Sequence, residues 1–128
     1  MAVRGLRGAT TVETNSKEEI ISRTKEMLEV LIEKNLIKQA DIISAIFSVT
    51  EDLDAEFPAA AARQIGWKYT PLLCTREIPV TGSLPLCIRV LIHVNSDISQ
   101  EEMVHVYMRE AKKLRPDLAD KDSNIYTS

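Results

Sequence analysis

One run of apolar residues constrains the fold of this chain more than any other stretch. It covers residues 84–94 and is bounded by turn-forming residues at 81–83 and 95–97. Its length and its content of β-branched residues predict a strand in the core. Successive side chains of a strand point to opposite faces. One face therefore carries Ile88, Val90, Ile92 and Val94, and the other carries Cys87, Arg89, Leu91 and His93.

Arg89 lies in the middle of this second face. An arginine does not lose its charge in a protein, and an unpaired buried ion is strongly destabilising. Something negative or rich in hydrogen-bond acceptors must therefore meet Arg89. Two interpretations remain open at this point: an internal salt bridge to a carboxylate, or a preformed site for an anionic ligand.

Length, charge and cysteine content limit the class of protein. A chain of 128 residues with 45% hydrophobic residues is sufficient for one domain with its own core. The net charge of −3 argues against a nucleic-acid surface. No apolar run approaches the ~20 residues of a membrane span. Two cysteines, Cys74 and Cys87, and a start that does not resemble a signal peptide predict a cytoplasmic protein with free thiols.

The first half of the chain predicts a strand, a helix and a second strand. Residues 2–12 favour a strand in which glycines flank Arg7, and such glycines mark a bulge or a close approach. An edge strand with a solvated arginine is the alternative. Residues 42–50 predict the second strand. The helix between them begins at the capping box of Ser16 and Glu19, ends near Asn35, and has an apolar stripe of Ile20, Thr24, Met27, Leu28 and Leu31.

The second half predicts two further helices and a hairpin. Residues 57–66 form a short helix bounded by a proline and a glycine. Residues 67–80 are extended and pair with the Arg89 strand as a hairpin. A second capping box, Ser99 and Glu102, predicts a helix that continues to residue 114 and includes Tyr107. Tyr107 either belongs to the core or contacts a ligand through its hydroxyl group.

Motifs for covalent and metal-dependent chemistry are missing from the sequence. The histidines, His93 and His105, lie on different predicted elements, and no metal-ligand spacing or P-loop occurs, so we expect no metal. Cys74 could be a nucleophile, but a structural or ligand-contacting cysteine is the better interpretation. An active site here would rely on arginines, a glutamate and a tyrosine, which bind anions and stabilise charge.

Several segments together resemble one family, the trimeric α/β class of monofunctional chorismate mutase, which is unrelated to the all-helical chorismate mutases. The resemblance runs in order and at matching spacing from about residue 3 to residue 118. The segments that carry it are residues 3–13, 57–59, 74–77, 87–90, 105–107 and 114–118.

The resemblance implies a fold, an assembly and a reaction. The fold is of the α+β class, ferredoxin-like, with helices on one face of a mixed sheet in a single domain over residues 1–117, followed by a polar tail at 118–128. Three chains form a pseudo-α/β-barrel with active sites between neighbouring subunits. The reaction converts chorismate to prephenate by a Claisen rearrangement in phenylalanine and tyrosine biosynthesis, without a cofactor or a covalent intermediate.

The resemblance also implies roles for particular residues. Arg89 would bind the ether oxygen and a substrate carboxylate, so that the substrate supplies its counter-charge. Arg7 and Tyr107 would hold a carboxylate, while Glu77 and Cys74 would bind the ring hydroxyl. The remaining pocket residues are Leu73, Thr75 and Arg76 from the same region, Phe57, Ala59 and Arg63 from the adjoining subunit, and Arg115 near the mouth.

The sequence departs from the usual pattern of this family at two positions. Ala60 and Leu73 stand where family members often have lysine and threonine. Cys74 and Glu77 are three residues apart, so we expect a bulge near Thr75 and Arg76 to bring them into one pocket.

Two alternative functions on the same scaffold remain open, because a fold does not fix a function. One is a non-catalytic trimeric binder of a small carboxylate metabolite, and the other, more remote, is an imine deaminase.

Overall fold

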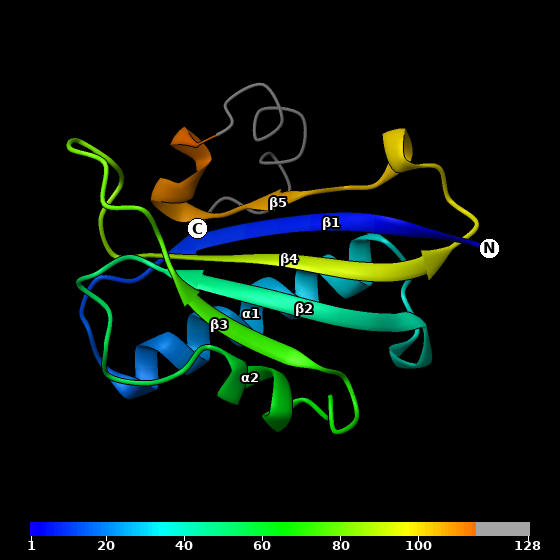
Figure 1. Ribbon diagram of the computed structural model, residues 1–128, viewed down its shortest axis with the longest axis horizontal. Helices are drawn as coiled ribbons and strands as arrows, with labels where there is room; N and C mark the ends of the chain where they lie inside the picture. Colours follow the sequence, from blue (N-terminus) through cyan, green and yellow to red (C-terminus); the bar gives the residue numbers. More distant parts are fainter. Residues whose placement is uncertain (115–128) are drawn as a thin grey trace.

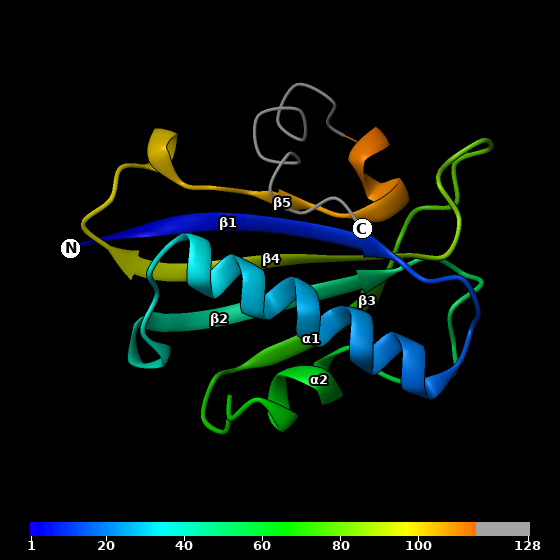
Figure 2. The ribbon, with the colours of Figure 1, turned by 180° about the vertical axis from the view of Figure 1, so that it is seen from behind.

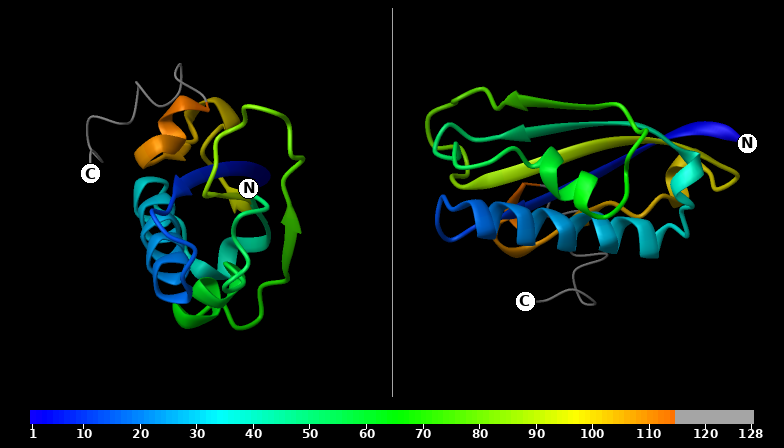
Figure 3. Two further views of the ribbon diagram at one scale, coloured as in Figure 1. Left: turned by 90° about the vertical axis from the view of Figure 1, so that its left-hand side faces the viewer. Right: turned by 90° about the horizontal axis from the view of Figure 1, so that it is seen from below.

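The computed structural model describes residues 1–114, which form a five-stranded sheet with both α-helices on one face (Figures 1 and 3). The predicted tail at 118–128 and Arg115 lie outside the described residues. No helix within residues 1–114 is long and apolar enough to cross a bilayer. The elements are β1 (Ala2–Thr11), α1 (Lys17–Lys34), η1 (Gln39–Asp41), β2 (Ile42–Val49), α2 (Ala59–Gln64), β3 (Leu72–Arg76), β4 (Cys87–Ser96), η2 (Gln100–Glu102), β5 (Val106–Tyr107) and η3 (Arg109–Lys113).

The sheet is mixed, as predicted, and its order is β3-β2-β4-β1-β5. Strand β4 is antiparallel to both β1 and β2, whereas β3 is parallel to β2 and β5 is parallel to β1. The predicted hairpin between β3 and β4 is therefore wrong. Parallel neighbours need a crossover connection, and α2 provides it between β2 and β3. This crossover puts β3 on the far side of β2 from β4 (Figure 1).

The structure confirms the predicted ends and the predicted apolar stripe of helix α1. The hydroxyl of Ser16 accepts the N–H of Glu19 at the N-terminus, and Asn35 is the C-cap. The buried side chains of α1 are the five of the predicted stripe. Figure 2 shows the sheet from its helix side, with α1 in front of the strands and crossing them diagonally. Gly8 of β1 permits this packing, since a Cβ atom there would lie 2.7 Å from Cδ1 of Leu31.

The two faces of β4 differ as the alternation predicts. Ile88, Val90, Ile92 and Val94 are buried against the helices, whereas Arg89, Leu91 and His93 are partly exposed. Cys87 is the exception, since it is buried on this face; the hydroxyl of Thr50, just after β2, accepts its N–H. We call the face of the sheet away from α1 and α2 the open face. Its accessible side chains include Arg7, Ile46, Ser48, Leu73, Arg89 and Leu91.

The helix predicted from Ser99 to residue 114 does not form. The hydroxyl of Ser99 donates to the side chain of Glu102 and does not cap a helix, so only the 3₁₀ turn η2 follows. The chain then becomes strand β5, in which Val106 and Tyr107 pair with Gly8 and Ala9 of β1. The available edge of β1 thus overrides the local helical signal.

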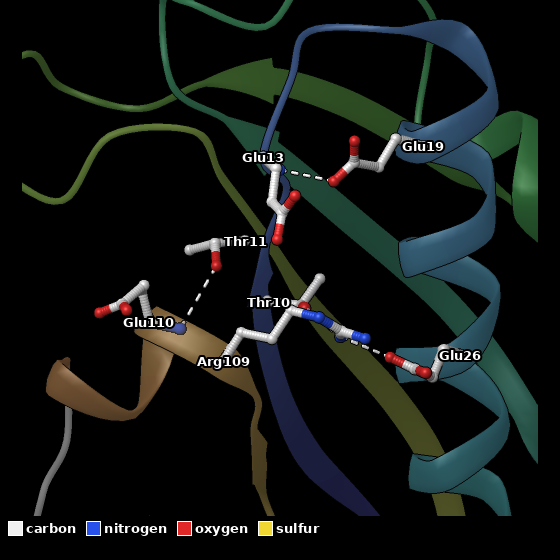
Figure 4. Close-up of polar contacts among 7 residues, drawn as sticks. All are labelled: Thr10, Thr11, Glu13, Glu19, Glu26, Arg109 and Glu110. Carbon is white, nitrogen blue, oxygen red and sulfur yellow. Dashed lines mark hydrogen bonds and ion pairs between the residues drawn. The ribbon is translucent and has the colours of Figure 1, made fainter. Parts of the chain in front are cut away.

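The segment after β5 is fastened to β1 and α1 (Figure 4). Arg109 donates to the hydroxyl of Thr10 and forms an ion pair with Glu26 of α1. The N–H of Glu110 donates to the hydroxyl of Thr11 at 3.3 Å. These contacts immediately follow Tyr107, so they help to fix this tyrosine against the sheet.

Candidate active site

A cavity of about 240 Å³ opens on the open face of the sheet. It brings together four residues that the sequence analysis singled out: Arg7, Glu77, Arg89 and Tyr107. The rest of the lining consists of Gly8, Ile46, Ser48, Val90 and Leu91. Cavities that bind small molecules are usually ~300–1,000 Å³. The volume is therefore small for a cavity that would enclose a small molecule by itself.

A larger groove of about 740 Å³ runs along the solvent side of α1. Its polar lining consists mainly of lysine and glutamate side chains of one helix, such as Lys25 and Glu29, with Ile21 and Val30 between them. Mixed charges on a helix face are typical of a solvated surface. The smaller cavity on the open face is therefore the better candidate for a functional site.

Strand pairing places the cationic residues of the cavity. Arg89 of β4 has Ala9 of β1 and Ser48 of β2 as its neighbours across the sheet. Arg7 of β1 is opposite Leu91 of β4. The backbone N–H of Arg7 also donates to Nδ1 of His105 at 3.0 Å. The sheet thus presents both guanidinium groups on one surface.

Arg89 already has a protein partner. Its Nη1 lies 3.3 Å from Oε1 of Glu77, and the two side chains are 40% and 25% exposed. The expectation that the protein leaves Arg89 without a counter-ion is therefore wrong, because Glu77 follows the end of β3 and faces the same surface. The ion pair is nevertheless part of the cavity and uses one nitrogen of the guanidinium group. The internal salt bridge thus lies in the same cavity as the candidate anion site.

The buried hydroxyl group of Tyr107 is the clearest sign that this region can bind a ligand. The residue is 4% exposed, and its hydroxyl has no hydrogen-bond partner among residues 1–114. A buried polar group without a partner costs roughly 1–3 kcal/mol. Tyr107 is part of the lining of the cavity that also contains Arg7 and Arg89. A ligand with hydrogen-bonding oxygens would satisfy it.

The charges in the cavity favour an anion. Two guanidinium groups, those of Arg7 and Arg89, face one carboxylate, that of Glu77, so positive charge is in excess. Nearby Cys87 cannot supply a thiolate, because its burial raises the pKa of the thiol to about 12. Among the described residues, no cluster of His, Cys, Asp and Glu could hold a metal ion. The two guanidinium groups of the site can bind and stabilise negative charge.

The side chains of Cys74 and Glu77 point to opposite faces of the sheet. The ladder between β2 and β3 runs without a register shift from Leu72 to Arg76, so the predicted bulge is wrong. The side chains of Leu73 and Thr75 share the open face with Glu77, whereas Cys74 packs toward the core. Within one chain the thiol of Cys74 therefore does not reach the cavity.

The backbone of Cys74 has a different orientation from its side chain. The N–H of Ala45 donates to the carbonyl of Pro71, and the N–H of Glu77 donates to the carbonyl of Val49. Alternation along the ladder then turns the N–H and C=O of Cys74 away from β2. These groups lie at the free edge of the sheet, where a ligand or a neighbouring chain can meet them.

Some of the other predicted residues line a second cavity, of about 410 Å³, next to β3. Phe57, Cys74, Thr75 and Arg76 are part of its lining, and Phe57 is 65% exposed. Arg76 is already used by the fold, since its Nη1 donates to the carbonyls of residues 50, 51 and 53.

Helix α2 holds the last two predicted residues. Ala59 is buried in the core, so its methyl group is not available to a ligand. Arg63 is exposed on the last turn of the helix. The structure thus does not bring Phe57, Ala59 or Arg63 into the first cavity of the same chain.

Ser48 is the polar cavity residue that the sequence analysis missed. It belongs to the predicted strand at 42–50, and alternation with the buried Phe47 and Val49 places it on the open face. The available signal was a serine near the end of the strand, on the face that also carries Ser44 and Ile46. Its contact with Glu77 could not be inferred, because the predicted sheet had β3 next to β4.

Comparison with known proteins identifies the family of this chain. The family model of chorismate mutase type I matches residues 3–118. The chain is 48% identical to the chorismate mutase AroH of Bacillus subtilis (strain 168) over 120 residues, which cover 93% of this chain and 94% of that protein. It is 54% identical to the AroH chorismate mutase of Thermus thermophilus over 117 residues, covering 91% and 96% of the two chains.

A solved structure agrees with both sequence comparisons. The chorismate mutase from Clostridium thermocellum superimposes with a TM-score of 0.84 at 51% identity, covering 85% of this chain and 97% of that one. The similar fold therefore extends over nearly all of the solved protein. The chain belongs to the chorismate mutase type I family, whose members are isomerases that convert chorismate to prephenate.

Proposed function

We propose that this chorismate mutase carries out the isomerisation of chorismate to prephenate in the cavity that contains Arg7, Glu77, Arg89 and Tyr107. The reaction is a unimolecular Claisen rearrangement, so the protein needs to hold the substrate in a compact shape and stabilise charge. The buried, unpartnered hydroxyl of Tyr107 beside two arginines is the observation that carries this proposal. It marks the place of a ligand carboxylate.

Arg89 has the central role in this mechanism. The ether oxygen of the substrate gains negative charge as the carbon–oxygen bond breaks, and a fixed guanidinium group stabilises that charge. Arg7 and Tyr107 hold a carboxylate and thereby restrain the reactive conformation. A ~10⁶-fold acceleration corresponds to about 8 kcal/mol of barrier. Conformational restraint and electrostatic stabilisation can share that amount.

Glu77 binds the ring hydroxyl of the substrate in this proposal. Its carboxylate lies beside Arg89 and balances part of the positive charge. The two carboxylates of the substrate then complete the charge balance of the site. The backbone of Cys74 at the sheet edge, together with Leu73 and Thr75, contributes to the wall.

We also propose a homotrimer in which a neighbouring chain completes each site. Ile46 of β2 lies opposite both Leu91 of β4 and Leu73 of β3, and these three side chains form an exposed apolar row across the open face. Exposed apolar patches of this kind favour association between chains. Phe57 lies near β3, and Arg63 is on the last turn of α2, outside the cavity of the same chain, so both are available to the cavity of a neighbour.

Cytoplasmic phenylalanine and tyrosine biosynthesis is the setting that we propose for this reaction. The non-catalytic binder of a small carboxylate metabolite is not favoured, because the matched relatives over nearly the whole chain are chorismate mutases. Following the loss of chorismate absorbance with the purified protein separates the two functions. A binder would retain chorismate without converting it.

Replacement of Arg89 tests the role of the cation. Arg89→Lys keeps a positive charge but loses the planar fork of donors, so kcat/KM should fall by an amount equivalent to about 3 kcal/mol or more. Arg4→Lys is the matched control, because Arg4 also lies on a sheet strand but donates to the carbonyl of Ile98, outside the cavity. Near-normal turnover of Arg89→Lys would refute the proposed role.

Mixed trimers test whether two chains share one site. Arg89→Ala and Arg63→Ala should each be nearly inactive alone if one chain supplies Arg89 and its neighbour supplies Arg63. When the two variants are unfolded and refolded together, some sites will contain two intact halves, and activity should reappear. No recovery in trimers that are shown to be mixed would place both arginines in sites built by a single chain.

A further inference from the structure

Ser48 lies beside Arg89 in the lining of the candidate site. It belongs to β2, where its neighbours across the sheet are Arg89 on β4 and Thr75 on β3. Its side chain is half-buried and lines the cavity. A serine in this position can hydrogen-bond to groups on either neighbouring strand.

The hydroxyl of Ser48 donates to Oε2 of Glu77. The other carboxylate oxygen, Oε1, accepts from Nη1 of Arg89 at 3.3 Å. The carboxylate therefore bridges a serine and an arginine, with one oxygen for each. The backbone of Glu77 is fixed separately, since its N–H donates to the carbonyl of Val49 at 2.9 Å. The orientation of the carboxylate is left to Ser48 and Arg89.

We infer that Ser48 is a positioning residue that keeps the Glu77 carboxylate from closing on Arg89 with both oxygens. Arginine and carboxylate readily form a two-pronged pair. Such a pair would use donors of Arg89 that the proposed mechanism directs to the ether oxygen. By retaining Oε2, Ser48 limits the ion pair to one nitrogen. This inference rests on the function proposed above and adds a residue that acts through Glu77.

The effect of removing the hydroxyl should appear mainly in turnover. Negative charge on the ether oxygen develops in the transition state, so loss of free donors on Arg89 raises the barrier more than it weakens substrate binding. For Ser48→Ala we expect kcat to fall about tenfold, with KM changed by less than about threefold. Ser48→Thr keeps a hydroxyl group and should restore kcat to within about threefold of the original protein.

Ser44→Ala is the matched control. Ser44 is also on β2 and on the same face, but its hydroxyl pairs with Nδ1 of His93 at 3.2 Å and does not line the cavity. This variant loses the same atom from the same strand, and its kcat should stay within about twofold of the original. Urea unfolding of all variants shows whether a lost hydroxyl has simply weakened the fold.

A double-mutant cycle with Glu77→Ala identifies the route by which Ser48 acts. If Ser48 works through Glu77, Ser48→Ala should have almost no further effect on kcat once Glu77 is alanine. A tenfold fall in both backgrounds would overturn the inference, as would an equal fall in Ser44→Ala. An unchanged kcat for Ser48→Ala, with Glu77→Ala strongly impaired, would overturn the inference and leave the proposed function intact. Near-normal activity of Glu77→Ala would contradict both.

Discussion

The side chain of Asn35 is paired with both backbone groups of Val104. Its Oδ1 accepts the N–H of Val104 at 2.8 Å, and its Nδ2 donates to the carbonyl of Val104 at 2.9 Å. The same Nδ2 also donates to the carbonyl of Leu31 at the end of α1. One buried amide thus joins the helix terminus to the segment that leads into β5 and Tyr107.

Replacement of Asn35 should be costly for the fold. Asn35→Leu fills similar space but leaves the backbone groups of Val104 without their partner in a site where Asn35 is 3% exposed. Each buried group without a partner costs roughly 1–3 kcal/mol. We expect the free energy of unfolding, measured in urea, to fall by about 2–4 kcal/mol. A loss below about 0.5 kcal/mol would show that water or a rearranged backbone replaces the amide.

Thr24 should behave in the opposite way. It is fully buried in α1, and its hydroxyl has no hydrogen-bond partner among residues 1–114. Thr24→Val preserves the shape and removes the unsatisfied group, so thermal unfolding should show a gain of about 1 kcal/mol. Thr24→Ser keeps the hydroxyl and loses a methyl group, and this variant should be less stable than the original. A destabilised Thr24→Val would mean that the hydroxyl is satisfied.

The two glycines of β1 should respond differently to alanine. At Gly8 a Cβ atom would meet Leu31 at 2.7 Å and Met27 at 3.2 Å, both in the buried face of α1. Overpacking of this kind costs about 1–3 kcal/mol, which chemical denaturation can measure. At Gly5 the nearest atoms are 3.8 and 3.9 Å away, so Gly5→Ala is the control and should be nearly neutral. Equal effects at both positions would contradict the close approach of α1 to Gly8.

Cys87 should make stability depend on alkaline pH. Burial raises the pKa of its thiol from the ordinary value of 9.0 to about 12. Above pH 9 the unfolded chain loses this proton while the native chain keeps it, so the contribution is complete below pH 9 and decreases as the pH rises toward 12. The slope is at most about 1.4 kcal/mol per pH unit. Cys87→Ala lacks this contribution, so the stability difference between the two proteins should shrink with pH. A constant difference would contradict the raised pKa.

Local patterns predicted much of the fold correctly. The stripe of α1, its capping serine and the alternation of β4 follow from contacts between residues close in sequence, and the structure confirms them. The helix at 99–114 and the β3–β4 hairpin were wrong because strand pairing decided both. Val106 and Tyr107 pair with β1, and β3 crosses over to the far side of β2. Neither partner can be identified from the pattern of the segment itself.

The site, like the fold, was predicted only in part, because some of its contacts depend on strand pairing. Alternation placed Arg89 on the accessible face, and the local sequence singled out Arg7 and Tyr107. The resemblance to a family supplied Glu77 and the roles of all four residues, which the structure brings into one cavity. The Arg89–Glu77 ion pair and the contribution of Ser48 depend on β2 lying between β3 and β4. They could not be predicted without the strand order.

The most direct test of the proposed site is a crystal structure of the protein with a bicyclic transition-state analogue. The proposed mechanism predicts the analogue in the cavity of the open face, with its ether oxygen within hydrogen-bond distance of Arg89. A carboxylate of the analogue should contact Arg7 and the hydroxyl of Tyr107, and a neighbouring chain should close the cavity. An analogue bound elsewhere, with Arg89 still paired only to Glu77 and the Tyr107 hydroxyl without a partner, would contradict the proposal.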